Sequence, residues 1–489
     1  MREGKRVMSR RGLATASQVT TIDPASLVAP TTLRIPDRMV LDILTIIEIG
    51  LVVASAALAK LLYIALFLDS EQQFQPYIVA GLAGGLVTHY LMRSRGLHEP
   101  AAILGWRRRL GELLLAIGLS FLVLIALAYL LKVSADYSRG WLLTWLAITS
   151  IILTLSRPAS AGLLRWLAAT GYTARRIAVV AGSAAGYRLA DSLRHAQGVR
   201  VVGLFDETGQ DEEGRPRATI SDLISMGQRN QIDEVVIALS NAPQAHTAHL
   251  IEALSVLPVD VWLCPAEFDM PILGTSRLGA LSLLQVKPKP IRDWGYVMKL
   301  ALDYALASLS LVLFGPLMLL AALAIKIESP GPVLFKQRRH GYNHRLIHVY
   351  KFRTMRVAED GPVIAQARKD DDRITRVGKF LRRTSIDELP QLFNVLKGEM
   401  SLVGPRPHAV AHNQHYRERL DRYANRHCVK PGMTGWAQIH GFRGPTEDPE
   451  KMRKRVEMDL YYIENWSFWL DLKIIAVTPL VGFIHRNAF

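Results

Sequence analysis

Residues 382–394, with the sequence RRTSIDELPQLFN, place two adjacent carboxylates directly after two arginines and two hydroxyl side chains. The spacing Ser385-x-x-Glu388 fits a capping box, which predicts that a helix begins here. Pro390 is close enough to this start to be tolerated. In the first turn of that helix, Asp387 would lie among free backbone N–H groups that favour negative charge. The same pattern is also typical of an ordinary capped surface helix with an acidic N-terminus.

The side-chain types of this stretch suit phosphoryl transfer. The Asp387 carboxylate can act as a nucleophile towards phosphorus, and Glu388 can bind Mg²⁺, which prefers one or two carboxylates together with phosphate oxygens of a substrate. Arg382 and Arg383 can bind other phosphate oxygens in a bidentate manner. The acid pair by itself does not decide between this site and a surface helix, so the neighbouring motifs must.

Four motifs surround and include the acid pair. They are 351–355 (KFRTM), 387–392 (DELPQL), 400–407 (MSLVGPRP) and 430–438 (KPGMTGWAQ). With these motifs, the chain from about Trp294 to the C-terminus resembles the bacterial polyprenyl-phosphate hexose-1-phosphate transferases, the monotopic phosphoglycosyl transferases. The resemblance implies that Asp387 forms a covalent phosphosugar intermediate and that Glu388 binds magnesium.

Other side chains in and near these motifs are candidates for substrate binding. Lys351 and Arg353 alternate in a strand-like segment, which predicts that both lie on one face of a strand, where they meet a diphosphate or simply water. Arg406 lies between two prolines, in a rigid loop that can fix its guanidinium on a phosphate. Gln438 follows a glycine-containing turn and can contact the sugar or the base. Asp459 is a further candidate acid.

Three histidines, His408, His412 and His415, have a spacing that would place them on one face of a helix. Such an arrangement can imitate a zinc site. Phosphoryl transfer from a nucleotide sugar does not require zinc, so Mg²⁺ is the cofactor that we expect.

Residues 407–413 (PHAVAHN) and 441–444 (GFRG) resemble the glucose-type branch of the family. The resemblance implies UDP-glucose as the UDP-sugar donor and undecaprenyl phosphate as the polyprenyl phosphate acceptor. Asp387 would attack the β-phosphate, UMP would leave, and the acceptor phosphate would attack the phosphoglucosyl-aspartate to give undecaprenyl-diphosphate-glucose. This reaction would initiate exopolysaccharide or capsule synthesis.

Other functions stay open at this point. The donor can be another UDP-hexose, such as UDP-galactose. A membrane-anchored NAD-dependent nucleotide-sugar dehydratase or epimerase is a second enzyme class, although the α/β region described below lacks a Tyr-x-x-x-Lys pair. A membrane scaffold or sensor that binds a nucleotide is the non-enzymatic alternative.

The composition indicates a membrane protein. The 489 residues leave room for roughly two to four domains, and half of the residues are apolar. The formal charge of +16 suits an anionic membrane surface or phosphate-bearing substrates, and no motif that reads nucleic acid is present. Cys264 and Cys428 are solitary, so no disulfide framework or Cys-x-x-Cys metal site is expected.

Residues 38–157 contain four apolar segments, which predict a bundle of four transmembrane helices. The segments are 39–68, 77–92, 113–131 and 141–155. A buried soluble helical bundle is the alternative. The preceding residues 1–37 are basic and polar, so we expect them to be disordered, without a cleaved signal peptide.

Lysine and arginine occur at the start of the chain, between the second and third segments, and after the fourth, at 2–11, 93–109 and 157–176. The positive-inside rule then places both ends of the four-helix unit in the cytoplasm. We therefore expect a protein of the bacterial inner membrane, in contact with its lipids, with the catalytic domain on the cytoplasmic face. The sequence leaves open whether the chain forms a homo-oligomer.

Residues 172–285 are expected to form a Rossmann-like α/β domain. Four buried strands, near 177–180, 201–205, 234–239 and 259–263, alternate with helical patterns, which indicates a parallel sheet. The first turn, 181–186 (AGSAAG), departs from the dinucleotide fingerprint at its first two positions, although Asp206 lies where a ribose-binding acid would be. This departure favours a structural or regulatory domain over a redox domain, and the domain resembles the nucleotide-binding-like module of the longer family members.

Residues 286–489 are expected to form an α+β catalytic domain, which begins with a Lys/Pro spacer at 286–290. The apolar run 304–325 is long enough to span a membrane, but Pro316 predicts a bend. Basic residues flank the run on both sides, so both flanks prefer the cytoplasm. We therefore expect residues 299–327 to form a re-entrant membrane helix, folded as a hairpin, as the family resemblance also implies. A kinked spanning helix is the alternative.

The C-terminal part of this domain carries aromatic residues between 461 and 469 that suit a membrane interface. The apolar run 474–484 is too short to span and predicts either an interfacial helix or a core helix of the catalytic domain.

Overall fold

The computed structural model describes residues 36–67, 74–180, 184–194, 198–206, 218–238, 244–264, 274–278, 281–356, 373–408, 422–442 and 449–484. They divide into two compact units, one within Thr32–Ala174 and one within Arg175–Phe489. Nearly all of the stretch 1–37, for which we expect disorder, lies outside the described residues.

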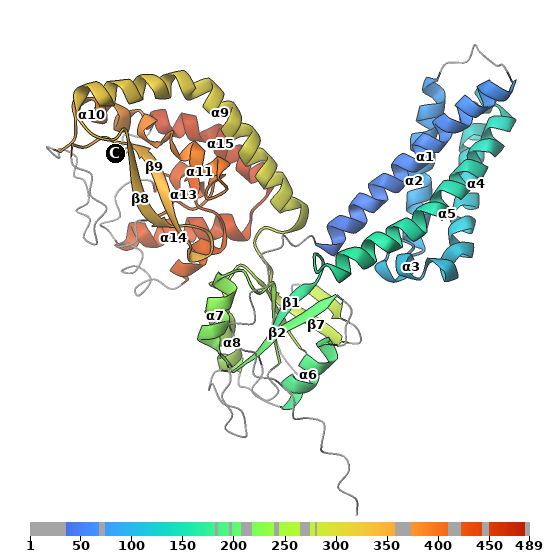
Figure 1. Ribbon diagram of the computed structural model, residues 1–489, viewed down its shortest axis with the longest axis horizontal. Coiled ribbons are helices and arrows are strands. Elements are labelled where there is room, and N and C mark those ends of the chain that lie inside the picture. The colour runs from blue at the N-terminus through green and yellow to red at the C-terminus, as the bar shows by residue number, and fades with distance from the viewer. Residues whose placement is uncertain are drawn as a thin grey trace, which may run out of the picture. The chain divides into compact units, whose positions relative to one another are not determined.

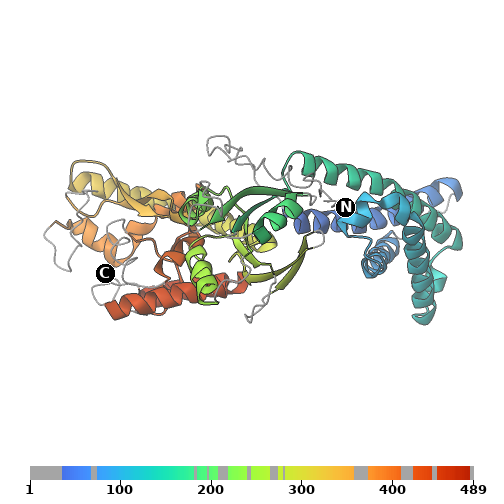
Figure 2. The ribbon, with the colours of Figure 1, turned by 90° about the horizontal axis from the view of Figure 1, so that it is seen from below.

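The first unit is a helical bundle (Figures 1 and 2). Its elements are α1 (Asp37–Phe67), α2 (Gln75–Ser94), α3 (Pro100–Leu104), α4 (Trp106–Leu130), the 3₁₀ turn η2 (Ser134–Asp136) and α5 (Arg139–Ala169). Trp141 and Trp145 of α5 stack in its core with ring centroids 4.9 Å apart. Trp145 Nε1 also donates to the Val52 carbonyl of α1 at 3.3 Å, so this buried tryptophan joins α5 to α1.

Four described helices are long and apolar enough to cross a membrane: Arg38–Tyr63 of α1, then α4, α5 and, in the second unit, α9 (Asp293–Glu328). The bundle presents apolar side chains outwards, such as Leu122 and Leu143. Hydroxyl groups lie inside, where Ser55 and Thr149 are hydrogen bonded at 2.8 Å. This distribution suits a lipid environment, where interior polar groups join helices, and the chain is a membrane protein.

The second unit begins with an α/β sheet of seven strands in the order β3-β2-β1-β4-β5-β7-β6. The first five strands are parallel: β1 (Arg175–Val180), β2 (Val199–Asp206), β3 (Ala218–Thr219), β4 (Glu234–Ile237) and β5 (Asp260–Leu263). Helix α6 (Ala184–Arg194) covers one face, whereas α7 (Ile220–Gln228) and α8 (Gln244–Leu254) cover the other. Both faces are buried, which explains the continuous apolar runs of the strands. The predicted Rossmann-like parallel sheet is confirmed.

Two antiparallel strands at the edge of this sheet were not predicted. They are β6 (Gly274–Leu278) and β7 (Leu281–Lys287), and β7 pairs with β5. Residues 286 and 287, which we expected in a spacer, therefore complete a strand. The altered fingerprint residues 181–183 lie outside the described residues, so their conformation does not enter the argument.

The catalytic region is α+β, with short strands among helices. After α9 come β8 (Leu334–His340), the turn η3 (Tyr342–His344), β9 (Leu346–Phe352), α10 (Arg376–Arg383), the turn η4 (Ile386–Glu388), α11 (Gln391–Leu396), β10 (Ser401–Val403), the turn η5 (Tyr423–Cys428), β11 (Gly432–Thr434), α13 (Trp436–Ile439), α14 (Pro449–Glu464) and α15 (Phe468–Ile484). Strands β8 and β9 form an antiparallel hairpin, and β10 and β11 form a parallel pair. α15 contributes the fully buried Ile474 to the core, so it serves at least in part as a core helix.

Helix α9 is continuous over 36 residues, contains Pro316 and curves along its length (Figure 1). Its first half packs through Ala307 against the core that includes Val403. Its second half packs through Ile325 against Phe352. Both halves therefore rest on the same domain. The hairpin that we expected at Pro316 is wrong, because α9 is one curved, uninterrupted helix and not two helices joined by a turn.

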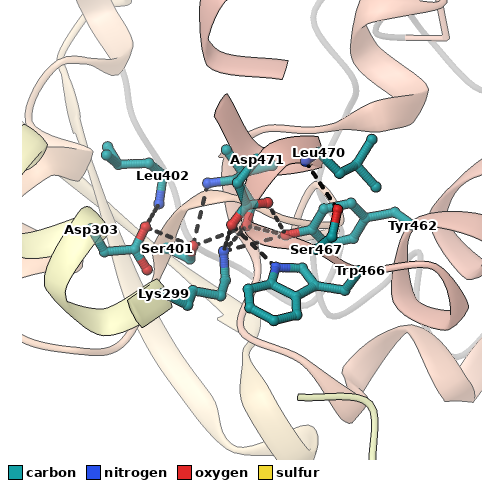
Figure 3. A network of polar contacts seen from close by, with 10 residues as sticks. Lys299, Asp303, Ser401, Leu402, Tyr462, Trp466, Ser467, Leu470 and Asp471 are labelled. Carbon is teal, nitrogen blue, oxygen red and sulfur yellow. Dashed lines mark hydrogen bonds and ion pairs between the residues drawn. The ribbon is translucent and has the colours of Figure 1, made fainter. Parts of the chain in front are cut away.

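Two charged residues of α9 are buried in a polar network with the catalytic core (Figure 3). Lys299 Nζ donates to Asp471 Oδ2 of α15 at 2.7 Å and to the Val403 carbonyl of β10 at 3.0 Å. Asp303 Oδ1 accepts from the Leu402 backbone N–H at 3.0 Å. Because the chain leaves β10 directly into the site loop described below, this network ties the membrane helix to that loop.

Candidate active site

The acid pair lies in η4, a 3₁₀ turn between α10 and α11, and not in the first turn of an α-helix. Ser385 adopts a left-handed φ of 58°, and its N–H donates to the Arg382 carbonyl, so it ends α10. Pro390 takes the N-cap position of α11. The predicted capping box is therefore wrong, because Ser385 closes one helix instead of opening the next. Asp387 gains no helix-dipole stabilisation from such a turn.

Glu388 is held by two cations from different elements. Lys351 Nζ, at the end of β9, donates to Glu388 Oε1 at 2.8 Å. Arg406 donates through Nη2 to Oε1 at 2.6 Å and through Nη1 to Oε2 at 3.2 Å. Such a forked pair fixes both the position and the plane of a carboxylate. The structure thus brings together three residues that the motifs singled out.

Asp387 has a different environment from its neighbour. Burial, followed by the negative charge of Glu388, raises the pKa of Asp387 to about 6, although Lys351, Arg382 and Arg406 oppose the shift. In the described part of the chain, its carboxylate has neither a hydrogen bond nor an ion pair of its own. A poorly solvated carboxylate without a fixed partner is the better nucleophile of the two.

Arg339 of β8 is a site residue that the sequence analysis missed. It is close enough to Arg406 and Glu388 for their charges to act on it, and burial, then Arg406, lower the pKa of Arg339 to about 10. Its guanidinium donates to the Pro407 carbonyl and to Gln337. The period of two in β8 would have placed Arg339 on the inward face. In the sequence analysis, Arg339 counted only as one of the basic residues that flank the apolar run 304–325.

Among the described residues, four cations therefore act on the acid pair: Arg339, Lys351, Arg382 and Arg406. Against two carboxylates they leave a formal charge of +2. Burial lowers the pKa of Lys351, an effect that Glu388 opposes. Such a concentration of partly buried positive charge requires anions in addition to the acid pair, and phosphate groups with forked acceptor geometry fit it.

A second layer of residues supports the loop that carries Arg406. Arg426 of η5 donates through Nη2 to the Arg406 carbonyl at 2.9 Å and forms a buried ion pair with Asp459 of α14 at 2.7 Å. Arg426 also lies 3.0 Å from His408 Nδ1. Burial, then Arg426, lowers the pKa of His408 well below its ordinary value, so this imidazole is neutral. Asp459, a candidate acid in the sequence, is thus the partner of a supporting arginine.

Arg353 does not lie in the site. β9 ends at Phe352, so the alternation that places Lys351 on the site face does not extend to Arg353. The buried Arg353 guanidinium donates to the carbonyls of Ser329 at 2.7 Å and Pro330 at 2.6 Å. These acceptors follow the end of α9, where helical carbonyls lack partners. Arg353 therefore holds the end of the membrane helix, and its prediction as a substrate-binding residue is not supported by its position.

The remaining candidates differ in their positions. Arg382 lies near Asp387 and donates through Nε to Thr354 Oγ1 at 2.8 Å. Arg383 is exposed on α10, and the described residues show it in no contact with the acid pair. Gln438 is buried in α13 and donates to the Met433 carbonyl at 3.2 Å, so in this structure it stabilises a turn.

The three candidate histidines are only partly described. His408 accepts or donates a 2.7 Å hydrogen bond with the Tyr423 hydroxyl, whereas His412 and His415 lie outside the described residues. In the described part of the chain, no group of three or more His, Cys, Asp or Glu side chains could hold a metal ion. Mg²⁺ needs only one or two protein carboxylates when substrate phosphates and water complete its shell. Glu388, the residue that we expect to bind Mg²⁺, fits this requirement as part of a site that a substrate completes.

Comparison with known proteins identifies two matching families. The "Bacterial sugar transferase" model matches residues 294–485, which include every residue of the site. A "CoA-binding domain" model matches residues 93–265, which include most of the parallel sheet.

Three relatives are described as UDP-glucose:undecaprenyl-phosphate glucose-1-phosphate transferases. The protein of Escherichia coli (strain K12) is 43% identical over 71% of this chain and 76% of its own length. That of Xanthomonas campestris pv. campestris is 38% identical over 81% and 83%, and that of Klebsiella pneumoniae is 39% identical over 76% and 81%. Identity of this extent, together with the acid pair in its cationic site, shows that the chain belongs to the bacterial sugar transferase family.

Proposed function

We propose that this protein transfers glucose 1-phosphate from UDP-glucose to undecaprenyl phosphate and thereby initiates synthesis of an exopolysaccharide. The observation that carries the proposal is the contrast within the acid pair. Glu388 is held by Lys351 and Arg406, while Asp387 is free to react beside the same cations. The names of the similar proteins supply the donor and the acceptor.

The reaction proceeds by two displacements at phosphorus. The Asp387 carboxylate attacks the β-phosphorus of UDP-glucose, the bond to the bridging oxygen breaks, and UMP leaves. A phosphate oxygen of undecaprenyl phosphate then attacks the phosphoglucosyl-aspartate, which releases the carboxylate and forms undecaprenyl-diphosphate-glucose. Arg406 and Lys351, with Arg339 behind them, offset the charge that develops on the phosphate oxygens. The two steps use one carboxylate as nucleophile and then as leaving group.

We propose Mg²⁺ as the cofactor, with Glu388 as its protein ligand. When bound, it neutralises charge on the leaving UMP. Glu388 has the role of holding it, because its position and plane are already fixed by Arg406. Of the remaining candidates, Arg382 is placed to bind a phosphate oxygen beside Asp387.

We further propose that the protein lies in the bacterial cytoplasmic membrane with its catalytic domain on the cytoplasmic face. Support comes from α9, whose two halves pack on the same domain while side chains near its middle, such as Val312 and Leu313, are exposed. A helix that dips into one leaflet and keeps both ends at one surface fits this arrangement. UDP-glucose and Mg²⁺ are available on that face.

The test is UMP release by the purified full-length protein in lipid nanodiscs that contain undecaprenyl phosphate. A panel of UDP-glucose, UDP-galactose and UDP-N-acetylgalactosamine identifies the donor, and we expect UDP-glucose to react fastest. Donor labelled in the sugar should label the wild-type protein when the acceptor is left out, and Asp387→Asn should abolish both labelling and turnover. Turnover by Asp387→Asn would remove the assignment of the nucleophile, and absence of UMP release with every donor would remove the proposed function.

A further inference from the structure

We infer that the α/β domain is a positioning module for the catalytic acid pair. The inference rests on the proposed function. It assigns positioning roles to Asn343 and to the hydrogen bond between Ser255 and Asn425, at two contacts between the α/β domain and the catalytic domain. Each contact lies on the element that carries, or supports, one of the two cations bound to Glu388.

The first contact is at the tip of the β8–β9 hairpin. Asn343 is 1% exposed, and its Nδ2 donates to the Gly227 carbonyl at 2.8 Å, the Gln228 carbonyl at 3.0 Å and Asn230 Oδ1 at 2.8 Å. The two carbonyls belong to the last turn of α7, and the Gly227 carbonyl also accepts from the Asn230 backbone N–H at 2.9 Å. Asn343 itself has a φ of 53°, a left-handed conformation that the hairpin turn requires.

The same hairpin carries the first cation. β8 and β9 pair without interruption from His340–Leu346 at the tip to Leu334–Phe352 at the base. Lys351 lies near the base, paired with Phe335, and binds Glu388 at 2.8 Å. From Leu346 at the tip to Lys351 the strand extends about 17 Å. A paired hairpin is stiff along its length, so the contact at its tip fixes the direction from which Lys351 reaches Glu388.

The second contact is at η5. Ser255, just beyond the end of α8, donates through Oγ to Asn425 Oδ1 at 2.9 Å. Cys428 Sγ lies 3.4 Å from the carbonyls of Ser255 and Val256. Lys287 Nζ, from β7, donates to the Ser255 carbonyl at 2.6 Å and so fixes this end of α8 within its own domain.

η5 supports the second cation. Arg426, the residue after Asn425, donates to the Arg406 carbonyl at 2.9 Å and is anchored on Asp459. Arg406 then binds both oxygens of Glu388. The path from α8 to Glu388 therefore has four links. Three are hydrogen bonds, from Ser255 to Asn425, from Arg426 to Arg406 and from Arg406 to Glu388, and one is the peptide bond between Asn425 and Arg426.

The two paths start from one structural layer. α7 and α8 pack side by side on the same face of the sheet, where Leu223 of α7 and Leu254 of α8 share one core cluster. A displacement of this layer moves the hairpin and η5 together, and Glu388 loses its fixed position. The domain thus acts on the reaction through two supports of a single carboxylate, Glu388.

The test uses two variants that remove one contact each. Asn343→Gly removes the side chain and keeps a residue that accepts a left-handed φ, and Ser255→Ala removes only the hydroxyl. Each should slow UMP release by about tenfold to a hundredfold, the effect expected when a catalytic group is misplaced. Ser225→Ala is the matched control, since within the described residues the Ser225 hydroxyl bonds to the Asp222 carbonyl of its own helix α7 and to no other group.

Double-mutant cycles separate positioning from a general loss of structure. The effect of Asn343→Gly should shrink in a Lys351→Arg background and persist in an Arg406→Lys background. The effect of Ser255→Ala should shrink in the Arg406→Lys background and persist in the Lys351→Arg background. Additive effects in all four combinations, in an active wild-type protein, would overturn the inference and leave the proposed function intact.

Hydrogen exchange gives a readout that needs no activity. Asn343→Gly should speed amide exchange in β9, and Ser255→Ala should speed exchange in residues 401–408, relative to Ser225→Ala. Unchanged exchange in both segments would refute the mechanical link, even if the protein releases no UMP.

Discussion

Arg406 binds Glu388 through two hydrogen bonds, Nη2 to Oε1 at 2.6 Å and Nη1 to Oε2 at 3.2 Å. This pairing makes the two adjacent carboxylates unequal. Glu388 is fixed and neutralised, whereas Asp387 keeps a raised pKa of about 6 beside it. Neighbouring acids with different environments take different roles, and the guanidinium of Arg406 is the basis for the division into a nucleophile and a metal ligand that we propose.

The fork geometry predicts a large effect of a conservative change. Arg406→Lys keeps the charge but loses one of the two hydrogen bonds and the plane that they define, so UMP release should fall by about tenfold or more. Arg383→Lys is the matched control, because Arg383 is exposed on α10. Initial rates of the two variants at saturating UDP-glucose check the prediction, and equal rates would show that the charge alone matters.

The raised pKa of Asp387 predicts that this residue destabilises the folded protein at neutral pH. The folded state binds its proton more tightly than the unfolded state, so its contribution to stability falls as pH rises from about 4 towards 6. Asp387→Asn should therefore raise the free energy of unfolding by about 1–3 kcal/mol at pH 8. The gain should disappear near pH 4.

Thermal unfolding of wild type and Asp387→Asn at pH 4.5 and pH 8, in one detergent, measures this difference. An equal change in midpoint at both pH values would contradict the assigned cause. The variant remains inactive at both pH values, so the gain in stability is separable from catalysis.

Arg353 and Lys351 are two residues apart, but their substitution should have different effects. Arg353→Met removes the donors to the Ser329 and Pro330 carbonyls, so it should lower the free energy of unfolding by about 1–3 kcal/mol. Lys351→Met should mainly lower the rate of UMP release, because Lys351 binds Glu388. Thermal unfolding and the KM for UDP-glucose of both variants check the assignment. A raised KM for Arg353→Met in a stable protein would return Arg353 to the substrate site.

The buried network at the start of α9 predicts a strong effect on stability. Lys299→Met leaves the Asp471 carboxylate buried without its cation, which should cost about 3–5 kcal/mol. The double variant Lys299→Met/Asp471→Asn should recover part of this loss, because no uncompensated charge remains. Thermal unfolding of the wild type, the single variants Lys299→Met and Asp471→Asn, and the double variant measures the recovery. If the double variant loses as much free energy of unfolding as the two single variants together, the unpaired charge is not the cause of the loss in Lys299→Met.

The fold could be predicted from the sequence wherever one local pattern determined it. Continuous apolar runs marked the parallel strands, since both faces of the sheet are buried, and apolar length marked the membrane helices. Prediction failed where two local signals competed. Ser385-x-x-Glu388 has the form of a capping box, yet the backbone of Ser385 closes the preceding helix.

The sequence predicted the motif residues of the site better than it predicted the residues that support them. Lys351 and Arg406 reach Glu388 as the motifs suggested, but Arg353 leaves the face because its strand ends one residue earlier. Arg339 and Arg426 were missed because burial of an arginine depends on which distant segments cover it. Local sequence does not encode that information.

The curvature of α9, with both of its halves seated on one domain, determines how the two substrates reach each other. On the topology proposed here, the lipid acceptor arrives by sideways diffusion in a single leaflet and never has to leave the bilayer, while the sugar nucleotide arrives from water. The products also separate into these two phases, because UMP is released into solution and the glycolipid product diffuses laterally in the membrane. The acceptor lipid therefore reaches the site by diffusion in the two dimensions of the membrane and not in three dimensions through water.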